Sequence, residues 1–159
     1  MACLFNTLYS RAVVTEVQGK EEATMLTAAS TQKKVLVAEA DPQVAELIVG
    51  LLSRQRIEVI IAHEGREAVQ KALAENPDAI LLDSTLLAVG GIDICQILKS
   101  NKATRDIPLA FLTGPENHKA STAAQHASAL MLIPKPFKPQ HLISSVGLLL
   151  SSRRKKPAA

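Results

Sequence analysis

Ala79-Ile80-Leu81-Leu82-Asp83 is the stretch that decides the fold, because a short apolar run ends there in a carboxylate and a loop follows it. Such runs are typical of strands that are buried on both faces of a parallel sheet. Ligands of these α/β sheets bind at the edge where the strands end. The stretch therefore predicts a buried strand with Asp83 at a candidate binding site.

Three more apolar runs end in residues with useful chemistry. Residues 35–38 lead into Glu39, residues 109–112 lead into Thr113, and residues 130–133 lead through Pro134 into Lys135. If all these strands are parallel, an acid cluster, a hydroxyl and an ammonium meet at one edge of the sheet. That set of groups can hold a divalent cation and a phosphoryl group.

Helical periodicity alternates with these runs from Lys33 onwards. Asp41 is placed to cap the first helix, and Pro42 takes the first helical position, which proline favours. Residues 57–62 add a fifth strand, and the alanine-rich segment 116–127 adds the fourth of five helices. This alternation predicts an α/β fold, a doubly wound parallel sheet of five strands with five helices. The apolar stripes of the other helices are Val44, Leu47, Ile48, Leu51 and Leu52; Ala68, Val69, Ala72 and Leu73; Ile94, Cys95 and Leu98; and Leu142, Ile143, Val146, Leu149 and Leu150.

The composition fits one compact domain with extensions. The 159 residues are 47% hydrophobic, which is enough to bury a full core. The acids and bases of residues 33–152 balance, and the net charge of +3 arises from the basic tail 153–159. With only 3% aromatic residues and no Trp, the chain lacks the stacking surfaces of single-strand binders. We therefore expect no nucleic-acid partner.

The cysteine pattern indicates a reducing compartment, and the hydropathy indicates that no segment spans a membrane. Cys3 and Cys95 form neither a disulfide framework nor a metal-ligand pattern. No run approaches the roughly 18 apolar residues that a membrane helix needs, and the N-terminus lacks the basic region of a leader. The sequence therefore predicts a cytoplasmic protein without a membrane span. The histidines share no ligand spacing and are expected to be solvated; they are His63, His118, His126 and His141.

Residues 1–32 differ from the rest and are predicted to be an N-terminal extension and linker. Their local signals conflict, but one short apolar patch stands out, made of Leu4, Phe5, Leu8 and Tyr9. Such a patch is costly to leave in water, so we expect it to dock on a protein partner. One domain is expected over residues 33–152, followed by the tail 153–159.

Residues 34 to about 152 resemble the receiver domain of two-component response regulators, which has a flavodoxin-like fold with strand order 2-1-3-4-5. Separations of 30 positions from Asp83 to Thr113 and of 22 from Thr113 to Lys135 match this family. Each motif alone is weak, but together and in order they are specific. The matching stretches are Lys34-Val35-Leu36-Val37-Ala38-Glu39-Ala40-Asp41-Pro42, Pro77-Asp78-Ala79-Ile80-Leu81-Leu82-Asp83, Phe111-Leu112-Thr113-Gly114 and Pro134-Lys135-Pro136-Phe137.

The resemblance implies a role for each site residue. Asp83 would be the phosphoacceptor, attacking a phosphohistidine or a small phosphodonor while Mg²⁺ neutralises the transferring oxygens. Thr113 would donate a hydrogen bond to the phosphoryl group, and Lys135 would pair with it. The bond between Lys135 and Pro136 resembles the family's cis peptide. Glu39, Asp83 and the backbone carbonyl of Thr85 would hold the metal.

The chain also departs from the family pattern. Ala40 stands where the family has a second acid that ligates Mg²⁺ directly, and a methyl group cannot do so. Asp41 is better explained as the helix cap than as a substitute ligand. Leu132 replaces an aromatic switch residue. The sequence therefore predicts an impaired, weak Mg²⁺ site and an altered switch.

Two functions from different classes follow. The first is a single-domain response regulator, phosphorylated on Asp83 by a histidine kinase or phosphotransfer protein, that signals through protein contacts. The alternative is a pseudo-receiver, a phosphorylation-independent protein-binding adaptor. In both, a downstream partner is expected to bind residues 1–32 and the face formed by helix 116–127, the strand before Pro134 and the last helix. An enzyme is not expected, because no base is placed to activate water.

Overall fold

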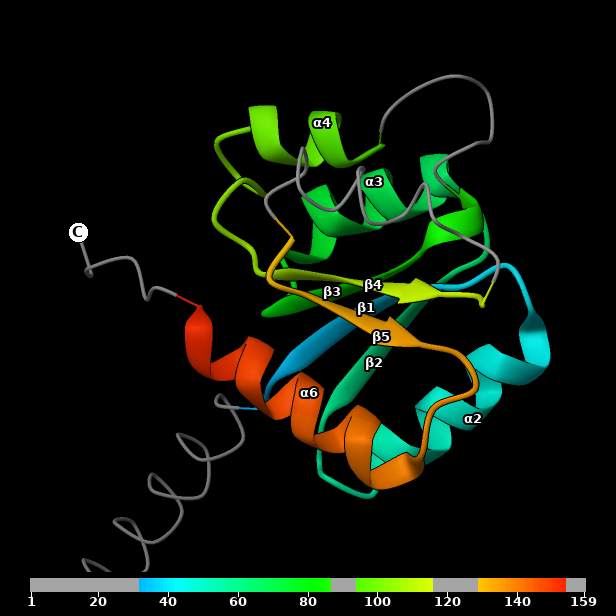
Figure 1. The fold of residues 1–159 in the computed structure, drawn as a ribbon. Helices are drawn as coiled ribbons and strands as arrows, with labels where there is room; N and C mark the ends of the chain where they lie inside the picture. Colours follow the sequence, from blue (N-terminus) through cyan, green and yellow to red (C-terminus); the bar gives the residue numbers. More distant parts are fainter. Residues whose placement is uncertain (1–31, 87–93, 116–128, 154–159) are drawn as a thin grey trace, which may run out of the picture. The chain divides into compact units, whose positions relative to one another are not determined.

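The computed structural model describes residues 32–86, 94–115 and 129–153 (Figure 1). Its five strands form one parallel sheet in the order β2-β1-β3-β4-β5. This order confirms the predicted flavodoxin-like topology. The strands are β1 (Lys34–Ala38), β2 (Glu58–Ala62), β3 (Ala79–Asp83), β4 (Leu109–Thr113) and β5 (Met131–Pro134).

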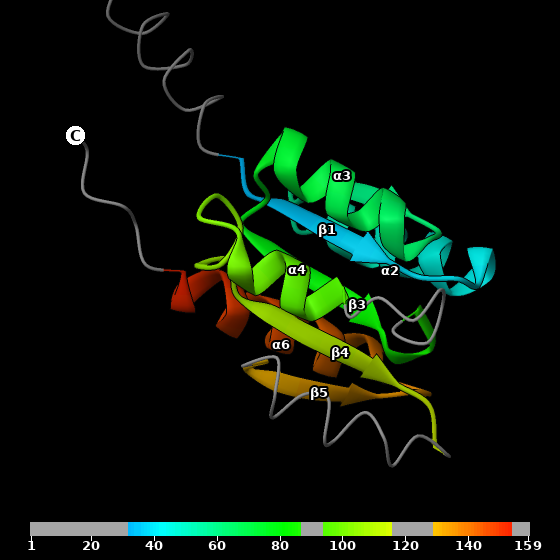
Figure 2. The same cartoon turned by 90° about the horizontal axis from the view of Figure 1, so that it is seen from above.

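Helices cover both faces of the sheet. Figures 1 and 2 show α3 and α4 on one face and α2 and α6 on the other. The expected helix over residues 116–127 lies outside the described residues, as do the predicted extension and nearly all of the basic tail. The described helices are α2 (Pro42–Ser53), α3 (Gly65–Glu75), α4 (Ile94–Ser100) and α6 (Pro139–Ser152).

The two faces of the sheet bury two separate apolar clusters, because side chains alternate along each strand. In β1, Leu36 packs in the cluster under α3 and α4, whereas Val35 and Val37 pack in the cluster under α2 and α6. Every residue of β3 and β4 is buried. This two-sided burial explains why these central strands are continuous apolar runs in the sequence.

The strand register brings the chemically capable residues to one edge. Ala38 pairs with Leu82, so Glu39 and Asp83 follow neighbouring positions on β1 and β3. Asp83 pairs with Leu112, and Thr113 pairs with Pro134, the residue before Lys135. The carboxyl ends of four strands therefore converge as the sequence predicts. Across the described parts of the chain, no helix has the length and apolar character required to cross a bilayer.

Candidate functional site

Two buried carboxylates and one ammonium form the centre of the site. Glu39 is 0% exposed and Asp83 is 2% exposed, at the ends of adjacent strands. The Nζ atom of Lys135 lies 2.6 Å from Oε2 of Glu39 and 3.4 Å from Oδ1 of Asp83. We call these three residues the acid pocket. The structure thus brings together three of the residues that the sequence selected.

Thr85 holds the Asp83 carboxylate from the following turn. Its backbone N–H donates to Oδ1 of Asp83 at 3.2 Å, and its hydroxyl donates to Oδ2 at 2.7 Å. Burial alone would raise the pKa of Asp83, but the bonds from Thr85, the hydrogen bond with Glu39 and the charge of Lys135 outweigh it and lower this pKa. Asp83 is therefore an ionised carboxylate at neutral pH.

The pKa of Glu39 is shifted in the opposite direction to that of Asp83. Burial raises its pKa above the ordinary value of 4.5, and Asp83 adds to this shift, while Lys135 and the N–H of Asp41 oppose it. The Asp41 N–H donates to Oε1 of Glu39 at 3.1 Å. The Lys135 ammonium meets Oε2 as an ion pair without ordinary hydrogen-bond angles. Two neighbouring acids thus have pKa values displaced to opposite sides.

The raised pKa of Glu39 predicts how stability depends on pH. The folded state holds this proton more tightly than the unfolded chain, so the stabilisation is full below 4.5 and is lost as pH rises through the folded pKa. Glu39→Gln should remove that decline in unfolding free energy, measured by urea titration across this range. The control is Glu46→Gln on the exposed side of α2. A decline that persists in Glu39→Gln would assign it to another group.

Asp41 caps α2, as predicted. Its Oδ1 accepts a hydrogen bond of 2.9 Å from the N–H of Gln43, and Pro42 follows it in the first turn. Neighbouring Ala40 is exposed and presents only a methyl group. Ala40 therefore adds no carboxylate to the acid pocket, and one oxygen of Asp41 is engaged in the helix cap.

The cap predicts a clear difference between two variants of Asp41. Asp41→Asn keeps the oxygen that accepts from Gln43, so its unfolding free energy should stay within a few tenths of a kcal/mol, whereas Asp41→Ala should lose about 1 kcal/mol. Urea denaturation measures both values. Mg²⁺ affinity should be equal in Asp41→Asn and the unchanged chain. Weaker Mg²⁺ binding by Asp41→Asn would show that Asp41 ligates the metal instead.

His63 contacts the backbone of Glu39, a contact that the sequence did not predict. Although the residue is exposed, its Nδ1 lies 3.1 Å from the backbone oxygen of Glu39. Glu67 of α3 accepts from the His63 N–H at 2.8 Å and pairs with Lys71 at 2.6 Å. The position of His63 in the sequence could have indicated this contact, because His63 directly follows β2 and Glu39 directly follows β1, the strand that pairs with β2.

Thr113 and Lys135 reach the site from β4 and β5. Thr113 is buried, and its carbonyl accepts a hydrogen bond of 2.7 Å from the N–H of Lys135. The peptide bond between Lys135 and Pro136 is cis, as the resemblance implied. Leu132, in the predicted switch position, is 40% exposed. Lys135 therefore lies in the acid pocket, and the backbone of Thr113 lies next to it.

The donor set fits a divalent cation only in part. Mg²⁺ requires near-octahedral oxygen ligands. Glu39 and Asp83 supply carboxylates, but the oxygens of both already contact protein donors. Within the described residues, no three acidic, histidine or cysteine side chains are grouped to hold a metal ion. Ala40, which directly follows Glu39, adds no side-chain oxygen to these two carboxylates.

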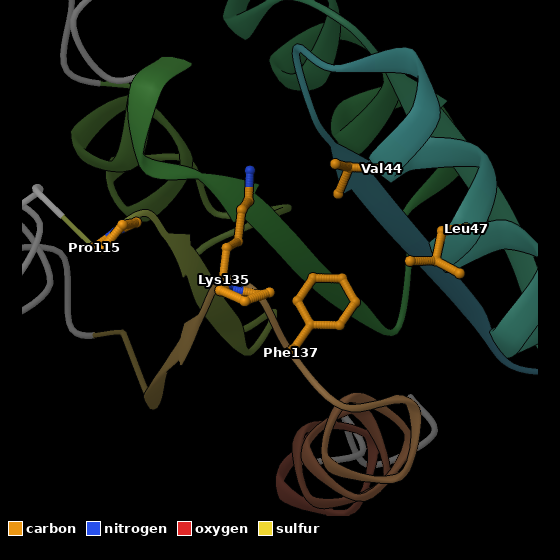
Figure 3. A pocket seen from close by; sticks show the side chains of 6 residues that line it. Val44, Leu47, Pro115, Lys135 and Phe137 are labelled. Atoms are coloured by element: carbon orange, nitrogen blue, oxygen red, sulfur yellow. The ribbon is translucent and has the colours of Figure 1, made fainter.

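An apolar hollow of about 290 Å³ opens beside the acid pocket. Figure 3 shows Val44 and Leu47 of α2 facing Phe137, with Lys135 alongside. Leu47 is 51% exposed, so this part of the predicted apolar stripe of α2 lines the hollow and does not enter the core. Pro115 and Pro136 complete the lining.

The five-stranded parallel sheet and the acid pocket together define a receiver-type α/β domain. The sequence model of the response regulator receiver domain matches residues 35–147. The chain therefore belongs to this family. Members relay signals by phosphorylation, typically bind Mg²⁺ at the phosphorylation site, and interact with histidine kinases and downstream effectors.

Relatives and solved structures agree with this assignment. Response regulator MprA of Mycobacterium avium is 32% identical over 124 residues, covering 78% of this chain and 53% of that protein. The alkaline phosphatase synthesis transcriptional regulatory protein PhoP of Bacillus subtilis is 32% identical over 127 residues, covering 80% of this chain and 51% of that protein. The chain thus spans about half the length of these relatives.

Two solved structures show the same fold. The signal receiver domain of a signal transduction histidine kinase from Syntrophus aciditrophicus superposes with a TM-score of 0.69 at 28% identity, covering 80% of this chain and 96% of that one. Chemotaxis response regulator CheY4 of Vibrio cholerae gives 0.68 at 23% identity, covering 75% and 99%.

Proposed function

We propose that this chain relays a signal by accepting a phosphoryl group on Asp83, which changes its affinity for a protein partner. The observation that carries this proposal is the Asp83 carboxylate, ionised and oriented by Thr85, with the Lys135 ammonium 3.4 Å away. An Asp83 oxygen attacks phosphorus, the bond from phosphorus to the donor nitrogen breaks, and that nitrogen keeps the electron pair. Lys135 and the Thr113 hydroxyl then stabilise the phosphoryl oxygens.

The metal site is proposed to be weak. Mg²⁺, when bound, neutralises charge on the transferring phosphoryl group. Glu39, Asp83 and the Thr85 carbonyl are its proposed ligands, and Ala40 supplies none. The pocket therefore depends more than a complete site does on the ammonium of Lys135.

The hollow beside Lys135 is proposed to receive the phosphodonor protein. A histidine kinase or phosphotransfer protein must bring its histidine to Asp83 at the strand edge. Val44, Leu47 and Phe137 offer apolar contacts next to that point. Downstream partners are proposed to bind residues 1–32 and the face that includes β5 and α6, where Leu132 and Leu148 are exposed.

The alternative function is a phosphorylation-independent adaptor. It is favoured by Ala40 in place of a metal ligand and by the aliphatic Leu132 in place of an aromatic switch residue. In this case the same surfaces bind protein partners constantly, and Asp83 remains unmodified.

A Mg²⁺ titration with beryllofluoride, a mimic of the phosphoryl group, separates the two functions. Phosphoryl relay predicts that the amide NMR signals of Thr85 and Thr113 shift together, at Mg²⁺ concentrations well above those that saturate a complete site. The adaptor predicts no shift at any Mg²⁺ concentration. Beryllofluoride without Mg²⁺ is the control.

Truncation to start at Lys33 tests the proposed partner surface of residues 1–32. Because receiver domains complete their core without such an extension, the midpoint of thermal unfolding should change by no more than about 2 °C. Partner binding or self-association, measured by pull-down and light scattering, should be lost. An unfolded truncation would instead place residues 1–32 in the core of the domain.

A further inference from the structure

The protein already contacts all four carboxylate oxygens of the acid pocket. In Glu39, Oε1 accepts from the Asp41 N–H and Oε2 meets the Lys135 ammonium at 2.6 Å. In Asp83, Oδ1 accepts from the Thr85 N–H and lies 3.4 Å from the same ammonium, while Oδ2 accepts from the Thr85 hydroxyl. A cation that entered the pocket would have to displace these contacts.

Two buried carboxylates need a compensating cation, since an uncompensated charge inside a protein is strongly unfavourable. Lys135 is the cation that bridges them, and its side chain is only 21% exposed. Its closer contact is with Glu39, the acid that precedes Ala40. The Lys135 ammonium therefore lies between the carboxylates of Glu39 and Asp83, the two acidic side chains proposed as Mg²⁺ ligands.

We infer that Lys135 is the resident cation of the acid pocket and takes the place of a divalent metal in holding Glu39 and Asp83 together. This inference rests on the weak metal site proposed above, and it names what replaces the metal. Lys135 and Mg²⁺ then compete for the same two carboxylates. Removing the ammonium leaves a pair of acids that is free to bind Mg²⁺.

The test compares Mg²⁺ binding by the full-length chain with that by Lys135→Met, which keeps the length of the side chain and removes its charge. At neutral pH, millimolar Mg²⁺ should hardly change the thermal unfolding midpoint of the unaltered chain. Lys135→Met should be less stable without Mg²⁺, should regain most of the lost midpoint when Mg²⁺ is added, and should bind it at least about tenfold more tightly.

Two further variants control for charge and for packing. Lys138→Met makes the same change at an exposed position and should show no gain in Mg²⁺ response. Glu39→Gln/Lys135→Met removes one acid with the ammonium, so it should fold without Mg²⁺ and lose the response. If Lys135→Met is unfolded without Mg²⁺, circular dichroism follows its refolding when Mg²⁺ is added.

Failure of this inference is distinct from failure of the proposed function. If Lys135→Met gains no Mg²⁺ affinity while Ala40→Asp does, the site is weak but Lys135 is not its resident cation. Strong stabilisation of the unaltered chain by Mg²⁺ would overturn the weak site as well. Phosphoryl labelling of Asp83 is measured separately and decides neither result.

Discussion

Asp83→Asn is expected to abolish phosphoryl labelling of the chain by a small phosphodonor such as acetyl phosphate. The amide keeps the shape of the side chain but cannot attack phosphorus, so labelling should fall by at least about 100-fold. Intact-protein mass spectrometry in the presence of Mg²⁺ measures the fraction that is labelled. The ionised state of Asp83, held by Thr85 and Lys135, is the physical reason for selecting this carboxylate.

The matched control is Asp106→Asn, because Asp106 is an exposed acid away from the acid pocket. This variant should be labelled like the unaltered chain. If Asp83→Asn is still labelled, the acceptor is another residue, and Glu39 is the first to test because it shares the pocket. Lack of labelling in the unaltered chain, under conditions that label a complete receiver, would favour the adaptor function.

The sheet was predictable because its central strands are buried on both faces. Continuous apolar runs such as 79–82 and 109–112 permit few other structures, and each ends one residue before the strand does. The cap by Asp41 was predictable for a similar reason, since an acid followed by proline at a helix start uses only local geometry. Strand order came from the resemblance, because alternation alone allows several orders.

Contacts between elements were harder to predict. Nothing in the sequence indicates that the Lys135 ammonium lies closer to Glu39 than to Asp83, because that preference depends on how β5 and the following loop pack. The bond from His63 to Glu39 depends likewise on the pairing of β1 with β2. Leu47 has the spacing of a core residue, but it lines the hollow and is 51% exposed.

Ala40→Asp is expected to strengthen Mg²⁺ binding by about tenfold or more, which is roughly 1.4 kcal/mol of binding free energy. Ala40 is exposed and directly follows Glu39, so an aspartate there adds a carboxylate beside the acid pocket without disturbing the core. A third acid also outweighs the Lys135 ammonium, which balances only one of the present two. Isothermal titration calorimetry measures the affinity.

Ala74→Asp provides the matched control, because it makes the same change at an exposed position near the end of α3, at the opposite edge of the sheet. It should leave Mg²⁺ affinity unchanged, which separates a new ligand from a general gain of negative charge. Equal affinities in Ala40→Asp and the unaltered chain would mean that the missing acid does not limit binding. Mg²⁺ binding would then be limited by the protein donors that already contact the oxygens of Glu39 and Asp83, because an added carboxylate does not remove those contacts.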